Sequence, residues 1–284
     1  MPGMRKTVRV GDIDLSYLEW DRGTIPLLLL HGLADNALVW SALADALSDR
    51  YHIVAVDMRG HGDSSKPECG YGFDRVIADL EALMDVLGWP QARVIGHSWS
   101  GKVATIWATQ NPQKLRAMVL VDPIFVYGMP GILRLSFPLF YRLLPFLQGM
   151  GPFESEAAAI AKARQMKQYR DWTPLQEAVF RQSIEQKPDG RWGSKFTIAA
   201  RDRIFDAVLR VPGLTRSVSV PTLFVQPESG VNRYNWQLKP YQKHLSHLEI
   251  RRVPGNHWAP LGEPEAFNAA IAPFLERHST TQTL

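Results

Sequence analysis

The chain has little cysteine and no long apolar run, and both absences narrow the classes of protein to which it can belong. Its 284 residues include one cysteine, Cys69, which excludes an internal disulfide and a cysteine-rich metal site. A membrane-spanning helix needs about 18 to 20 consecutive apolar residues, whereas the most apolar stretch, residues 132–147, contains two arginines and two prolines. Residues 1–10 are basic but lack the apolar core of a secretory signal. We therefore expect a cytoplasmic protein without stable membrane insertion.

A strong excess of one charge is also missing. The net charge is +4, and 45% of the residues are hydrophobic, as in ordinary globular proteins. The basic surplus lies in residues 125–210, where 13 Lys and Arg stand beside 8 Asp and Glu. Because acids and bases alternate there at helical spacing, the segment predicts a solvated helix face and no nucleic-acid partner.

Short apolar runs alternate with longer amphipathic stretches over most of the chain. This alternation predicts buried parallel strands separated by helices, and hence an α/β fold. Two β-type runs come first, at residues 6–10 and 14–20, and Gly11 and Asp12 join them as in a hairpin. The later strand candidates are residues 27–30, 53–56, 93–95, 118–121, 223–225 and 248–253.

The alternation stops between residues 125 and 210. This segment is rich in helix-forming residues and contains several prolines, and it holds no convincing strand. We predict a helical cap subdomain over 125–210, inserted into a core made of residues 1–124 and 211–284. Ligands of open α/β sheets bind outside the carboxyl ends of the strands, where such an insertion would lie. Peripheral helices without a lid function are the alternative.

Ser98 lies in a motif that predicts a catalytic nucleophile. It follows the strand candidate 93–95 and precedes a helical stretch, with the small residues Gly96 and Ser100 two positions away on either side. A serine at such a strand-to-helix turn is held in a strained, exposed conformation, and small neighbours make the turn possible. The Trp99 N–H at the start of the helix is then a candidate oxyanion donor.

Two further loops complete the constellation. Residues 31–34, directly after the strand candidate 27–30, would place the Leu33 N–H beside the serine as the second oxyanion donor. His257 follows the last strand candidate, from where an imidazole can reach Ser98 as general base and then general acid. By contrast, His61 is interpreted as a structural loop residue, and His97 is expected to face away from the pocket.

These motifs together resemble the α/β-hydrolase superfamily, in its serine-nucleophile, capped, esterase-like branch. The resemblance covers nearly the whole chain, through residues 31–34, 57–64, 96–101 and 253–258. It implies an eight-stranded, mostly parallel sheet, a cap after the sixth strand, and a Ser-His-acid triad without cofactor. Serine as nucleophile tells against the haloalkane dehalogenase and epoxide hydrolase branches, which carry aspartate at that position.

The acid of the triad departs from the commonest pattern of this superfamily. That pattern places an aspartate in the loop after strand seven, where this chain has Gly230 and Val231. Two candidates remain: Asp122 at the end of strand six, from which some members supply the acid, and Glu228 at the end of strand seven. We favour Asp122, because the end of a buried strand fixes a side chain more rigidly than a turn does.

The leading hypothesis is therefore hydrolysis of a small to medium carboxylic ester through an acyl-enzyme. Eight apolar side chains in residues 137–147 are candidates for lining the site, and no metal or cofactor is expected. A thioesterase, C–C hydrolase, lactonase or perhydrolase would use the same residues. A ligand-binding receptor with the hydrolase fold is the alternative from another class. The sequence sets neither the physiological substrate nor the oligomeric state.

Overall fold

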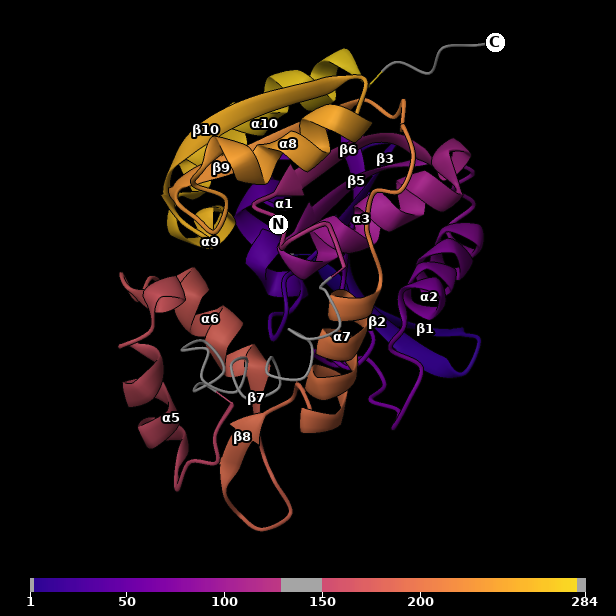
Figure 1. The fold of residues 1–284 in the computed structure, drawn as a ribbon. Helices are drawn as coiled ribbons and strands as arrows, with labels where there is room; N and C mark the ends of the chain where they lie inside the picture. Colours follow the sequence, from indigo (N-terminus) through magenta and orange to yellow (C-terminus); the bar gives the residue numbers. More distant parts are fainter. Residues whose placement is uncertain (1–2, 129–149, 280–284) are drawn as a thin grey trace.

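The computed structural model describes residues 3–128 and 150–279. Its main sheet has eight strands in the order β1-β2-β4-β3-β5-β6-β9-β10 (Figure 1). The β1–β2 and β2–β4 pairs are antiparallel, and all other neighbours are parallel. The strands are β1 (Met4–Val10), β2 (Ile13–Trp20), β3 (Ile25–Leu30), β4 (Tyr51–Val56), β5 (Ala92–His97), β6 (Leu115–Val121), β9 (Thr222–Ser229) and β10 (Leu248–Asn256). The predicted eight-stranded, mostly parallel sheet is confirmed.

Helices cover both faces of this sheet, and the side-chain alternation along each strand supplies both faces. In β3, Leu28 and Leu30 pack in the same core cluster as α2, α3 and α8, whereas Leu27 and Leu29 pack with α1 and α10. Successive residues of a strand point to opposite faces, so a strand covered on both sides needs a continuous apolar run. The helices are α1 (Ser41–Leu47), α2 (Phe73–Val86), α3 (Trp99–Gln110), α8 (Asn235–His244), α9 (Ala259–Gly262) and α10 (Pro264–Arg277).

Between β6 and β9 the chain leaves the sheet, and the described elements of this inserted segment lie together on one side of the core (Figure 1). They are α5 (Glu156–Ala163), α6 (Pro174–Ser183), β7 (Ile184–Gln186), β8 (Trp192–Ser194), α7 (Ile198–Arg210) and the short 3-10 helix η4 (Lys167–Tyr169). The expectation that residues 125–210 contain no strand is wrong, because β7 and β8 pair as an antiparallel hairpin. Three residues per strand are too few for an alternating pattern to be visible in the sequence.

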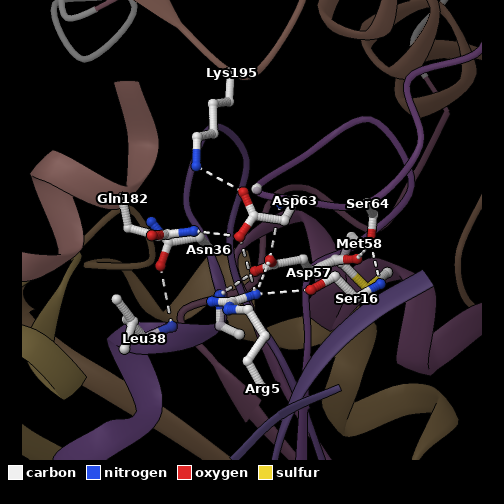
Figure 2. A network of polar contacts seen from close by, with 12 residues as sticks. Arg5, Ser16, Asn36, Leu38, Asp57, Met58, Asp63, Ser64, Gln182 and Lys195 are labelled. Atoms are coloured by element: carbon white, nitrogen blue, oxygen red, sulfur yellow. Dashed lines mark hydrogen bonds and ion pairs between the residues drawn. The ribbon is translucent and has the colours of Figure 1, made fainter. Parts of the chain in front are cut away.

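Asp63 and Asn36 are among the core side chains that bond to the inserted segment, and Figure 2 shows the contacts of Asp63. The Asp63 carboxylate accepts hydrogen bonds from Gln182 Nε2 of α6 and from Lys195 Nζ, each at 2.6 Å. Asp63 is itself fixed, since its N–H donates to the buried Asp57 carboxylate at 3.0 Å. Asn36, in the loop after β3, donates from Nδ2 to a main-chain carbonyl of α6 at 2.9 Å. The inserted segment is thus tied to loops at the carboxyl ends of β3 and β4.

Candidate active site

Ser98 occupies a strained turn between β5 and α3. Its φ of 55° and ψ of −114° place a non-glycine residue in the left-handed half of the backbone map, which costs conformational energy. Hydrogen bonds to and from the neighbouring main chain hold the turn, because the Ser98 N–H donates to Val121 O and the Ile124 N–H donates to Ser98 O. A Cβ on residue 96 would lie 2.5 Å from Ser100 O, so only glycine fits there.

Ser100 stands where the usual form of this turn has a second small residue, and its hydroxyl has a specific partner. The side chain is fully buried, and Oγ donates to His31 O at 2.6 Å. The side chain of Ser100 therefore fits into the turn, and its hydroxyl links the turn to the loop that follows β3.

Three of the predicted side chains meet at the carboxyl ends of the strands. Ser98 Oγ donates to His257 Nε2 at 2.9 Å, and His257 Nδ1 donates to Asp122 Oδ2 at 2.6 Å. The serine comes from the β5–α3 turn, the aspartate follows β6 directly, and the histidine follows β10. This is the order of contacts that a serine nucleophile, a general base and an orienting carboxylate require.

The Asp122 carboxylate is completely buried and has four hydrogen-bond donors. Besides His257, it accepts from the Val231 N–H at 2.7 Å, the Asn232 N–H at 3.0 Å and Asn232 Nδ2 at 2.9 Å. Burial acts to raise the pKa of Asp122, but the hydrogen bonds and the charge of His257 outweigh it and hold the pKa below its ordinary value. The group is therefore an anion at neutral pH, suited to stabilise a protonated imidazole.

The loop after β9 donates hydrogen bonds to Asp122 and contributes no carboxylate to the contact with His257. Glu228, the alternative candidate, is exposed, whereas Asp122 bonds to His257. Gly230 lets the loop approach, because a Cβ there would lie 2.4 Å from Asp122 Oδ2. Asn232 was not predicted as part of the site, because an amide two residues after Gly230 gives no signal that it donates to a carboxylate 110 residues earlier.

Leu33 and Trp99, the two predicted oxyanion donors, lie with Ser98 at the edge of one cavity. Trp99 is the first residue of α3, where main-chain N–H groups have no acceptor within the helix. Gly32 lets the loop after β3 lie close to Ser98, since a Cβ on Gly32 would lie 3.4 Å from Ser98 Cβ and 2.7 Å from His97 Nδ1. Both N–H groups are thus carried by segments that border the serine.

The expectation that His97 faces away from the pocket is wrong. Its ring lies 4.7 Å from that of His257, and its Nε2 donates to His257 O at 2.8 Å. Burial and the neighbouring His257 lower the pKa of His97 to about 3, so it stays neutral and supports the loop that carries His257. His61 is buried between the rings of Trp99 and Phe196, in agreement with a structural role.

The cavity above Ser98 has a volume of about 740 Å³ and is predominantly apolar. Core and inserted segment both line it, so a ligand would lie between them. The apolar side chains of residues 137–147, predicted to line the site, lie outside the described residues. The described apolar and aromatic lining consists of Ile124, Phe125, Val126, Tyr127, Ile204, Phe205, Val208, Trp236, Pro240 and Tyr241.

In the ranges 3–128 and 150–279, no group of three or more His, Cys, Asp or Glu side chains is arranged to hold a metal ion. In the same part of the chain, no helix has the length and apolar character needed to cross a membrane.

Comparison with known proteins adds the following. Residues 25–264 match the family model described as the alpha/beta hydrolase fold. An sn-1-specific diacylglycerol lipase of Mus musculus is 26% identical over 273 residues, covering 93% of this chain and 85% of the lipase. A fluoroacetate dehalogenase of a Burkholderia species is 32% identical over 130 residues, or 44% of this chain and only 42% of the dehalogenase. The crystal structure of E-2-(acetamidomethylene)succinate hydrolase superposes with a TM-score of 0.81 at 26% identity, covering 96% of this chain and 99% of that chain.

Proposed function

The chain belongs to the alpha/beta hydrolase fold family, and from this premise we propose that it is a serine hydrolase that cleaves small to medium carboxylic esters. The observation that carries the proposal is the continuous hydrogen-bonded series from Ser98 through His257 to the buried Asp122. It opens on a cavity whose lining is mainly apolar, as expected for the acyl or alcohol part of an ester.

In the proposed reaction, Ser98 Oγ attacks the acyl carbon while His257 Nε2 takes its proton. Asp122 keeps the Nδ1 proton in place and stabilises the imidazolium as it forms. The main-chain N–H groups of Leu33 and Trp99 bind the oxygen on which negative charge develops. His257 then gives its proton to the departing alcohol. In the second half, water attacks the acyl carbon while His257 takes its proton; the bond to Ser98 Oγ breaks, that oxygen regains the proton, and the acid is released.

Substitution of the nucleophile tests this proposal. We expect Ser98→Ala to lower turnover of p-nitrophenyl esters by several orders of magnitude with little change in thermal midpoint, because one oxygen is removed from an otherwise intact turn. Ser229→Ala is the matched control, since Ser229 lines the same cavity at the end of β9 and is not part of the proposed relay. Ester hydrolysis at the wild-type rate in Ser98→Ala would contradict the assignment.

Fluorophosphonate labelling separates an enzyme from a receptor with the same fold. An activated serine reacts rapidly, and labelling is lost in Ser98→Ala. A protein that binds its ligand without chemistry would stay unlabelled. Thioesters, lactones and substrates for C–C cleavage should be assayed beside the p-nitrophenyl esters, because the same three side chains would serve all these reactions.

A further inference from the structure

A second, smaller recess lies beside the main cavity, between the loop after β3 and the inserted segment. It has a volume of about 30 Å³, enough for one small chemical group. Leu33 and Trp258 line both spaces, so the recess adjoins the main cavity at these two side chains, close to the predicted oxyanion donor and to His257. Its remaining polar lining comes from Asp35, Gln168, Tyr169, Ser183 and Ser194.

Asp35 is the unusual member of this lining. Its side chain is only 6% exposed, and Oδ2 has no hydrogen-bond partner within the described protein. Leaving a buried carboxylate oxygen unpaired costs free energy, and such a group persists where something else pairs with it. Burial raises the pKa of Asp35 to about 7, so near neutral pH a donor group in the recess would favour its ionised form.

The two serines that line the recess with Asp35 already have partners. Ser183 Oγ already donates to Val179 O and accepts from Asn36 Nδ2. Ser194 Oγ accepts from the Phe196 N–H. A ligand in this recess that brings an O–H or N–H of its own can therefore pair with the Asp35 carboxylate.

We propose that the Asp35 recess is a specificity subsite that binds a hydroxyl or ammonium group carried on an otherwise apolar substrate. The inference rests on the proposed function only in assigning the rest of that molecule to the cavity above Ser98. The apolar body would lie in the large cavity, and its single hydrogen-bond donor would extend past Leu33 and Trp258 to Asp35. A site that pairs a buried polar group with a substrate donor discriminates strongly against the analogue lacking it.

Binding to the Ser98→Ala protein tests the site without relying on turnover. The probes are ω-hydroxy amides of four to eight carbons, each compared with the amide in which the hydroxyl is replaced by a methyl group. In a purely apolar cavity the methyl compound binds more tightly, because the hydroxyl must give up its water. We expect the hydroxy compound to bind at least about tenfold more tightly at one chain length.

Substitutions of Asp35 assign the preference to this side chain. In the same background, Asp35→Leu should reverse it in favour of the methyl compound. Asp35→Asn has nearly the same shape and should retain part of the preference for the hydroxy compounds over the methyl compounds. A matching series of ω-amino amides should bind tightly to the protein with Asp35 but not to Asp35→Asn, because an ammonium group needs the negative charge. Asp171→Asn is the control, since Asp171 is an exposed aspartate of the same inserted segment.

The outcomes separate this inference from the proposed reaction. Equal or tighter binding of the methyl compounds at every length, or a hydroxyl preference unchanged in Asp35→Leu, overturns the subsite and leaves water as the occupant of the recess. An Asp35-dependent preference in a protein whose Ser98 does not react with fluorophosphonate supports the subsite and contradicts the serine hydrolase. Ester turnover through Ser98 without any preference for the hydroxy compounds supports the serine hydrolase and contradicts the subsite.

Discussion

Asp122 and Asp35 are both buried aspartates that follow parallel core strands, yet their surroundings shift the pKa values of the two carboxyl groups in opposite directions. Asp122 receives four hydrogen bonds, and the pKa of its carboxyl lies below the ordinary value. Asp35 has an unpaired oxygen, and burial raises its pKa to about 7. The loop after β9 provides Asp122 with three donors through Val231 and Asn232. At Asp35 a hydrogen bond from the main chain of Asn36 acts to lower the pKa, but burial outweighs it.

The difference shows that burial does not by itself decide the charge of a carboxyl group. Burial disfavours the anion in both places, and only the donors around Asp122 reverse that effect. A carboxylate saturated by the protein can stabilise a neighbouring imidazolium throughout a reaction. A carboxylate left unsaturated is suited to pair with a group that arrives from outside.

Neutralising the two aspartates should have very unequal effects on catalysis. In Asp122→Asn, His257 loses both the group that sets its tautomer and the anion that stabilises its protonated form. We expect kcat for an ester to fall by about 10⁴, the loss caused by the same change in a serine protease. Asp35→Asn should retain kcat within about tenfold on esters without a donor group. A nearly normal kcat in Asp122→Asn would show that another group orients His257.

Displacing the Asp122 carboxylate without removing it should have a smaller effect. A Cβ introduced by Gly230→Ala would lie 2.4 Å from Asp122 Oδ2, so the loop or the carboxylate must move. We expect kcat to fall by about 10- to 100-fold, as for a misplacement of about 1 Å in an active site. Gly72→Ala is the control, because a Cβ there has nothing within 4 Å. Equal kcat values for the two variants would show that the loop adapts without disturbing Asp122.

The raised pKa of Asp35 should be visible as a pH dependence of stability. The folded protein holds this proton up to a pH of about 7, whereas the unfolded chain loses it near the ordinary aspartate value of about 4. The contribution of this group to stability is therefore fully present below the unfolded-state pKa of about 4, and it is lost as the pH rises towards 7. The corresponding free energy is on the order of 4 kcal/mol.

Urea unfolding of ligand-free protein at pH 5 and pH 8 measures this effect. Asp35→Asn has no titrating group at this position. Its free energy of unfolding, relative to that of the wild type, should therefore be higher at pH 8 than at pH 5. The same difference at both pH values would mean that Asp35 titrates normally in the folded protein.

The smallest effect is expected for Glu228→Gln. Its side chain is exposed, and the position beside His257 Nδ1 is taken by Asp122. We expect kcat to change by less than about tenfold, measured with the same ester as for Asp122→Asn. A crippled Glu228→Gln beside an active Asp122→Asn would exchange the roles assigned to these two acids.

The strands and the loops that carry Ser98 and His257 could be predicted because their signals are local. Apolar runs identify buried strands, and a serine between small residues at a strand-to-helix turn identifies a candidate nucleophile. What could not be predicted depends on contacts between distant segments. The donors to Asp122 come from residues 109 and 110 positions later, and the unpaired oxygen of Asp35 becomes evident only where the inserted segment covers the loop after β3.

The hydrogen bond from Ser100 to His31 has a consequence for how this protein can be re-engineered. It joins the turn that carries Ser98 to the loop that carries Leu33, a proposed oxyanion donor, and their parent strands β5 and β3 are direct neighbours in the sheet. The two loops therefore form one rigid frame that belongs wholly to the core. Inserted segments exchanged between relatives would meet the same frame each time, so selectivity could be redesigned there while the attacking group and its charge-stabilising neighbours keep their spacing.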